Sequence, residues 1–160
     1  MKLLIKQKLF SWLDSYDIFD EEDTTIFTVK GDSDFFSVFV SDHCGNPVGH
    51  ISQEINRGLP KHEIYMGDSC VGYVKKRSSL FRLKFDIDYK GWKVKGNFFE
   101  CDYAISDGNM EIAAVKKEVW NHTDTYAITV NNENDVVPVL MLVIAIDLAK
   151  YEYDCRDFIY

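Results

Sequence analysis

Basic side chains gather in one stretch of this chain, and the chemistry they could perform is the binding of phosphate. Between Lys75 and Lys95 lie eight lysines and arginines against two aspartates, although the whole chain carries a net charge of −8. Lysine and arginine hold phosphate oxygens by charge-assisted hydrogen bonds, as in sites for anionic lipid headgroups. The candidate anion- or lipid-binding residues are Lys75, Lys76, Arg77, Arg82 and Lys84.

The rest of this stretch suggests an alternative in which its charge is compensated. If Lys90-Gly91 is a two-residue hairpin turn, the two aspartates fall opposite the last two lysines. The resulting cross-strand pairs are Asp88 with Lys93 and Asp86 with Lys95, and they cancel most of the charge there. Because charge runs on strands usually face water, a merely solvated face is the alternative to an anion site.

Catalytic and metal-binding patterns are weak. Gly31-Asp-Ser33 and Gly67-Asp-Ser69 place a serine beside an aspartate, but neither forms the G-x-S-x-G turn of esterases, and we predict hairpin turns at both. The histidines and cysteines are dispersed, without metal-ligand or C-x-x-C spacing. They are His43, His50, His62 and His122, and Cys44, Cys70, Cys101 and Cys155. We predict no catalytic residue, metal or cofactor. The cysteines are expected to be free thiols in a reducing compartment. The alternative is a metal site or a Ser-His pair that the fold assembles from distant residues.

Period-two alternation dominates the chain up to residue 131. In residues 80–88, apolar residues alternate with charged ones, as a half-buried strand requires. Similar segments separated by turns such as Asp107-Gly108-Asn109 give about twelve strands, a pattern typical of a barrel or sandwich and not of βαβ units. Besides 80–88, the predicted strands are 3–10, 15–19, 25–30, 35–41, 47–55, 61–66, 70–76, 92–98, 100–106, 111–119 and 124–131.

The apolar segment from Val136 to Lys150 is predicted to be a helix. The polar residues 131–135 can cap it, and Pro138 falls in the first turn, where its missing N–H costs nothing. Residues 139–146 have no polar stripe, so protein must cover the helix on all sides. We therefore expect a mainly-β fold, a closed antiparallel barrel of about twelve strands around a central hydrophobic C-terminal helix, with residues 151–160 returning as a last strand. Asp147 should anchor the helix end or take part in binding at the barrel mouth.

The chain is expected to form one domain, residues 1–160. Val29-Lys30-Gly31 is echoed by Val94-Lys95-Gly96, which suggests an internal pseudo-repeat of about 29–65 and 94–129. The acidic net charge argues against nucleic acid as a partner. The N-terminus lacks the apolar core of a signal peptide, and no apolar run reaches the length of a transmembrane helix, so we expect a cytoplasmic protein.

The segments that carry a family resemblance are Lys6-Gln-Lys-Leu-Phe10, Tyr16-Asp-Ile18, Val29-Lys-Gly31, Gly45-Asn-Pro-Val-Gly49, Gln53-Glu54, His62-Glu-Ile-Tyr65, Val94-Lys-Gly-Asn-Phe-Phe99 and Val143-Ile-Ala-Ile-Asp147. In their order and spacing they resemble the LURP-one-related family, which belongs with the tubby C-terminal-like and phospholipid-scramblase proteins. The resemblance covers the whole chain and implies a twelve-stranded barrel filled by a C-terminal helix. It implies little about activity, although relatives in the wider superfamily bind phosphoinositide headgroups or act at membranes.

Two classes of function follow from these features. The first is a non-enzymatic binding or regulatory domain that binds anionic lipid headgroups, phosphate or a protein partner on the outer face of the barrel. The alternative is a small-molecule carrier or enzyme that uses a cavity inside the barrel or at its mouth. A helix that threads the barrel fills its interior with side chains and therefore favours the first.

Overall fold

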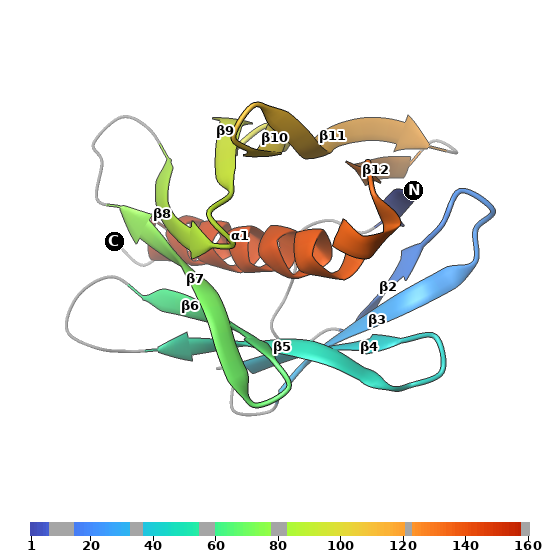
Figure 1. Ribbon diagram of the computed structural model, residues 1–160, viewed down its shortest axis with the longest axis horizontal. Helices are drawn as coiled ribbons and strands as arrows, with labels where there is room; N and C mark the ends of the chain where they lie inside the picture. The colour runs from blue at the N-terminus through green and yellow to red at the C-terminus, as the bar shows by residue number, and fades with distance from the viewer. Residues whose placement is uncertain (7–14, 33–36, 55–59, 78–82, 121–122, 158–160) are drawn as a thin grey trace.

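The computed structural model describes residues 1–6, 15–32, 37–54, 60–77, 83–120 and 123–157. Within these residues, one antiparallel sheet of twelve strands wraps around one α-helix (Figure 1). The alternation of apolar and polar residues predicts these strands closely, because each has one face toward the helix and one toward solvent. The strands are β1 (Lys2–Ile5), β2 (Tyr16–Phe19), β3 (Thr25–Gly31), β4 (Ser37–Asp42), β5 (Pro47–Glu54), β6 (Lys61–Met66), β7 (Ser69–Arg77), β8 (Lys84–Tyr89), β9 (Lys93–Asn97), β10 (Asp102–Asp107), β11 (Met110–Trp120) and β12 (Thr123–Val130).

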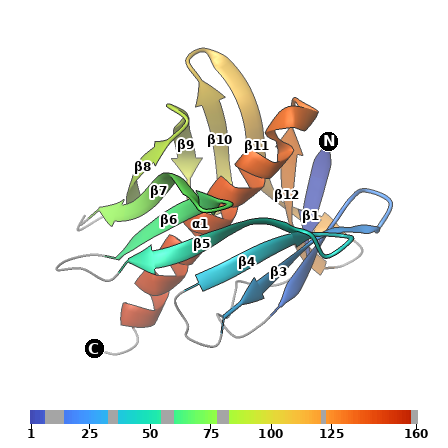
Figure 2. The same ribbon diagram turned by 60° about the horizontal axis from the view of Figure 1, so that its bottom comes forward.

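The sheet runs in the order β8-β7-β6-β5-β4-β3-β2-β1-β12-β11-β10-β9. Pairing of β1 with β12 joins the first strand to the last, so the barrel is complete everywhere except between β8 and β9. These two strands share a tight turn, then diverge and leave an unpaired gap that we call the seam (Figures 1 and 2). The expectation of a closed barrel was therefore wrong at this one position.

The helix begins where the sequence predicts. Asn132 accepts a hydrogen bond from the backbone N–H of Asn134, a 3-10 turn follows at Glu133–Asp135, and α1 runs over Val136–Asp157. The predicted end at Lys150 and the predicted last strand at 151–160 were wrong, because the helix continues through Asp157. Between Leu148 and Asp157 there is no glycine or proline to stop a helix.

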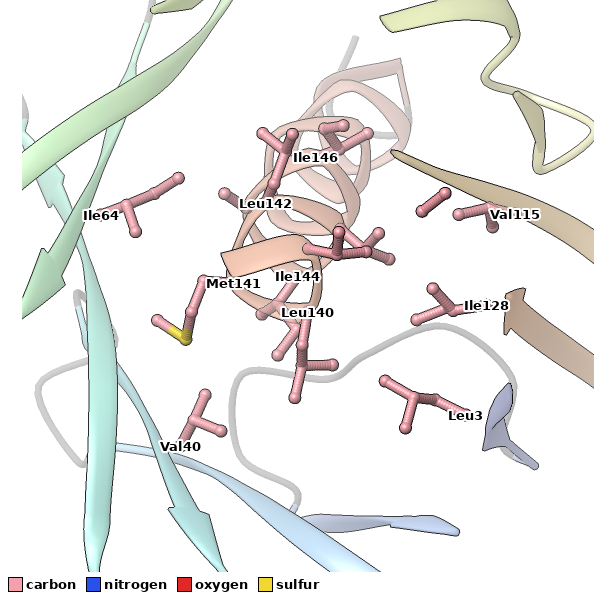
Figure 3. Close-up of a cluster of buried hydrophobic side chains, with 14 of the residues drawn as sticks. Leu3, Val40, Ile64, Val115, Ile128, Leu140, Met141, Leu142, Ile144 and Ile146 are labelled. Atoms are coloured by element: carbon pink, nitrogen blue, oxygen red, sulfur yellow. The ribbon is translucent and has the colours of Figure 1, made fainter. Parts of the chain in front are cut away.

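The core lies between α1 and the inward-facing side chains of the strands. Val40 and Ile64 lie on one side of the helix, and Val115 and Ile128 lie on the other (Figure 3). From residue 139 to residue 146 the helix side chains are at most 2% exposed. The helix therefore occupies the middle of the barrel, and no described helix is long and apolar enough to cross a membrane.

Candidate functional site

The seam lies along the helix, and α1 anchors it at two places. The Tyr89 hydroxyl, at the closed end of the seam, donates a hydrogen bond to the Pro138 carbonyl oxygen at 3.0 Å. The Lys150 Nζ, three turns further along the helix, donates to the Phe99 carbonyl oxygen at 3.0 Å, just beyond β9. Both strands that border the seam are thus placed by contacts to the helix.

Aromatic side chains underlie the seam. The ring of Phe85, on β8, meets the ring of Phe98, after β9, edge to face with centroids 4.9 Å apart. Phe98 also contacts Tyr103 on β10, at 5.3 Å between centroids. Because Ile87 and Val94 are half-buried against the same core, the inner side of the seam is apolar. Any polar ligand at the seam must therefore bind from the outer side.

Three of the five predicted cations lie together on the outer face beside the seam. Lys75 and Arg77 project from β7, opposite in direction to the buried Val74, and Arg77 lies directly across from Lys84 on β8. Arg77 Nε is 3.2 Å from Asp86 Oδ1, which is an ion pair between two exposed side chains.

The other two predicted cations, Lys76 and Arg82, are not part of this outer group in the described part of the chain. Lys76 has the same direction as Val74, lies across from Phe85, and is therefore on the inner face near the end of the strand. Arg82 lies outside the residues that the structure describes. The period-two rule applied from Val74 would have separated Lys76 from its neighbours.

Two further cations lie on β9. The alternative to an anion site paired Asp88 with Lys93 and Asp86 with Lys95, but β8 and β9 are not paired. Instead Lys93 lies across from Ser106, and Lys95 lies across from Ala104.

Both lysines are exposed, and neither forms an ion pair in the described part of the chain. The outer side of the seam therefore carries cations from three strands. We call Lys75, Arg77, Lys84, Lys93 and Lys95 the seam cations.

A second cluster of titratable groups lies in the second half of α1. Asp147 is half-buried, and burial raises its pKa to about 7, an effect that the nearby Lys150 partly offsets. The buried Lys150 also donates to Cys101 Sγ at 3.5 Å. Burial first, and then the charge of Asp147, raise the pKa of Tyr16 and Tyr103. Asp147 therefore lies near buried hydroxyls inside α1, ten residues before the helix ends at Asp157, and not at the helix end where it was predicted.

The turn and histidine residues considered as candidate catalytic or metal sites lie in a hairpin turn, in an aromatic stack or in the core. Gly67 lies in the predicted hairpin turn between β6 and β7, with a φ of 61°. His50 stacks between Phe39 and Tyr65, with centroid distances of 5.5 and 4.7 Å, and His62 is fully buried.

Ser33 and His122 lie outside the described residues. Among those that are described, no three histidine, cysteine or acidic side chains gather as a metal site would require. Cys44, Cys70 and Cys101 are free thiols.

Comparison with known proteins is consistent with this architecture. Residues 1–147 match the family model described as LURP-one-related. The chain is 28% identical over 155 residues to the uncharacterized protein YxjI of Bacillus subtilis strain 168, covering 94% of each chain. A solved X-ray structure of an Arabidopsis thaliana protein superimposes with a TM-score of 0.59 at 19% identity, covering 92% of this chain and 90% of that one, which shows a shared fold. The chain belongs to the LURP-one-related family.

Proposed function

We propose that this domain is a non-enzymatic binding or regulatory module of the cytoplasm that holds an anionic group at the seam cations. The group is a phosphate, either of a lipid headgroup or free in solution. The single observation behind the proposal is that β7, β8 and β9, the strands beside the seam, all carry outward-facing cations in a protein whose net charge is −8. An anion near this face responds mainly to the cations close to it. The acidic charges elsewhere on the protein are screened by salt beyond a Debye length, roughly 10 Å.

The arrangement of charges supports binding on the β9 side of the seam most strongly. Asp86 is engaged by Arg77, so part of the charge on the β8 side is compensated. The cross-strand neighbours of Lys93 and Lys95 are Ser106 and Ala104, which carry no charge. A phosphate oxygen can therefore approach these two lysines without displacing a neighbouring carboxylate from β10.

A carrier or enzyme is the second candidate, and one observation favours it. A cleft of about 360 Å³ is lined by Lys6, Ser15, Tyr16, Asp17 and Phe19. Tyr16 lines this cleft, and the charge of Asp147 contributes to raising the pKa of Tyr16. Asp147 itself has a raised pKa, a property that functional carboxyls often share. A metabolite panel read out by thermal shift tests this candidate, because a ligand that binds only the folded protein raises its melting temperature. Loss of such a shift in Lys6→Met would locate the ligand in this cleft.

Vesicle sedimentation tests the main proposal. We expect the protein to sediment with phosphatidylcholine vesicles that contain phosphatidylserine, to stay in solution with phosphatidylcholine alone, and to be released by salt. The test variant is Lys93→Glu/Lys95→Glu. Its matched control, Lys30→Glu/Lys116→Glu, changes the net charge equally through exposed lysines of β3 and β11.

Each lysine near an anionic surface contributes about 1 kcal/mol, so reversal of two should weaken binding at least tenfold. The control should bind within about threefold of the unmodified protein. Equal loss in the two variants would contradict a localised site. Competition by soluble inorganic pyrophosphate distinguishes free phosphate from a lipid headgroup, because a site specific for the membrane surface would not release its vesicles.

A further inference from the structure

The residues of β8 and β9 that border the seam are complementary to each other, although the two strands are not paired. Counting outward from the turn at Lys90-Gly91, Asp88 falls opposite Lys93 and Asp86 falls opposite Lys95. On the inner side, Ile87 falls opposite Val94, so that charge meets opposite charge outside and apolar meets apolar inside. Such cross-strand pairs are the contacts that stabilise antiparallel sheets.

The turn between these strands already has the geometry of a two-residue hairpin. Lys90 and Gly91 have φ of 53° and 70°, the positive values that a type I′ turn requires at both central positions. The Trp92 backbone N–H donates to the Tyr89 carbonyl oxygen at 2.9 Å, which forms the first rung of a ladder. Type I′ turns twist their strands into register, so this turn favours continued pairing of β8 with β9.

On the inner face, pairing would bring a glycine opposite an aromatic ring. Phe85 falls opposite Gly96, and the absence of a side chain at Gly96 leaves space beside the phenyl ring. A Cβ at Gly96 would lie 2.3 Å from the Asp102 carbonyl oxygen, so glycine is required there by the approach of β10 as well. The contact between the Phe85 and Phe98 rings, at 4.9 Å, occupies the gap in the open form.

We propose that the seam closes by pairing of β8 with β9, and that closure masks Lys93 and Lys95 with Asp88 and Asp86. An anionic ligand at these lysines and the closed seam then exclude each other. Closure would place Asp86 between Lys75 on β7 and Lys95 on β9, so that the carboxylate faces a cation on both sides. The masking half of this inference rests on the proposed function, whereas closure itself does not.

Disulfide trapping in the full-length chain tests closure. Asp86→Cys/Lys95→Cys is the in-register pair, placed in a background of Cys44→Ser, Cys70→Ser and Cys155→Ser, with the buried Cys101 retained. A disulfide requires Cα atoms within about 7 Å, which paired strands provide and diverging strands do not. The control is Asp88→Cys/Lys95→Cys, which is nearer the turn but two residues out of register.

In glutathione buffer we expect the in-register pair to oxidise at least tenfold faster than the control. Equal rates for both pairs, or no bond in either while the reduced proteins melt as the parent does, would overturn closure. Masking is tested with a second in-register pair, Ile87→Cys/Val94→Cys, which keeps the seam cations and both aspartates. Its oxidised form should bind phosphatidylserine vesicles at least fivefold more weakly than its own reduced form. Equal binding of the two forms would overturn masking, whereas failure of the unmodified protein to bind would overturn the proposed function and leave the trapping result valid.

Discussion

Asp147 gives the most quantitative prediction, because its carboxyl is placed where ionisation is unfavourable. Burial raises its pKa to about 7, whereas an unfolded chain ionises aspartate near pH 4. Between these two values the folded protein holds a proton that the unfolded chain has lost. Stability is therefore full below about pH 4 and falls as the pH rises to about 7.

The size of this effect follows from the difference in pKa. About three pKa units at about 1.4 kcal/mol each give an upper bound of about 4 kcal/mol above pH 7. Asp147 is half-buried and not fully enclosed, so we expect about half of that bound. Asp147→Asn removes the ionisation and should raise the free energy of unfolding at pH 8 by about 2 kcal/mol, or the Tm by about 4–8 °C, with little change at pH 4.

Urea denaturation between pH 4 and pH 8 measures this difference. Subtracting the curve of the variant from that of the unmodified protein removes the contribution of the histidines, which titrate in the same range. Asp102→Asn, at an exposed carboxyl of β10, is the control and should follow the unmodified protein. Parallel curves for Asp147→Asn and the unmodified protein over this range would refute the assignment of a buried, protonated carboxyl.

Three further substitutions test the packing that holds the seam and the helix. Lys150→Met removes the hydrogen bonds to Phe99 and Cys101 and should cost about 1–3 kcal/mol in urea denaturation. Gly72→Ala puts a Cβ 2.3 Å from the Asp88 carbonyl oxygen, so β7 and β8 must separate and the Tm should fall. The fall should exceed that of an alanine substitution at Gly67, which strains a φ of 61° but meets open space. Leu142→Ala, at a fully buried position, should cost about 2–5 kcal/mol, which a small Tm change would contradict.

The strands were largely predictable because alternating apolar and polar residues indicate which face of each strand is buried. The segment that became β8 is typical: Phe85 and Ile87 are half-buried, while Asp86 and Asp88 between them are exposed. The start of α1 was predictable for a similar local reason, since Asn132 can cap the first turn. Its end was not, because the alternating Tyr-Glu-Tyr-Asp of residues 151–154 looks like a strand, whereas the helix has no residue that stops it there.

The seam could not be predicted from the chain alone. The hairpin turn at Lys90-Gly91 was right, and the charges on each side of it favour pairing. Whether neighbouring strands pair depends on the circumference that the barrel needs around its helix, and on the Phe85 and Phe98 rings that meet inside. These are long-range conditions that no local pattern contains. The internal repeat and the single-domain boundary remain predictions.

The location of anion binding is the central claim, and backbone amide shifts measured during a ligand titration test it most directly. The protein is labelled with nitrogen-15 and titrated with a soluble short-chain phosphatidylserine, with short-chain phosphatidylcholine as the control. We predict saturable shifts at Lys84, Lys93, Lys95 and their strand neighbours, and none with phosphatidylcholine. Shifts confined to the opposite wall, β2 to β5, or equal shifts with both lipids, would contradict a site at the seam cations.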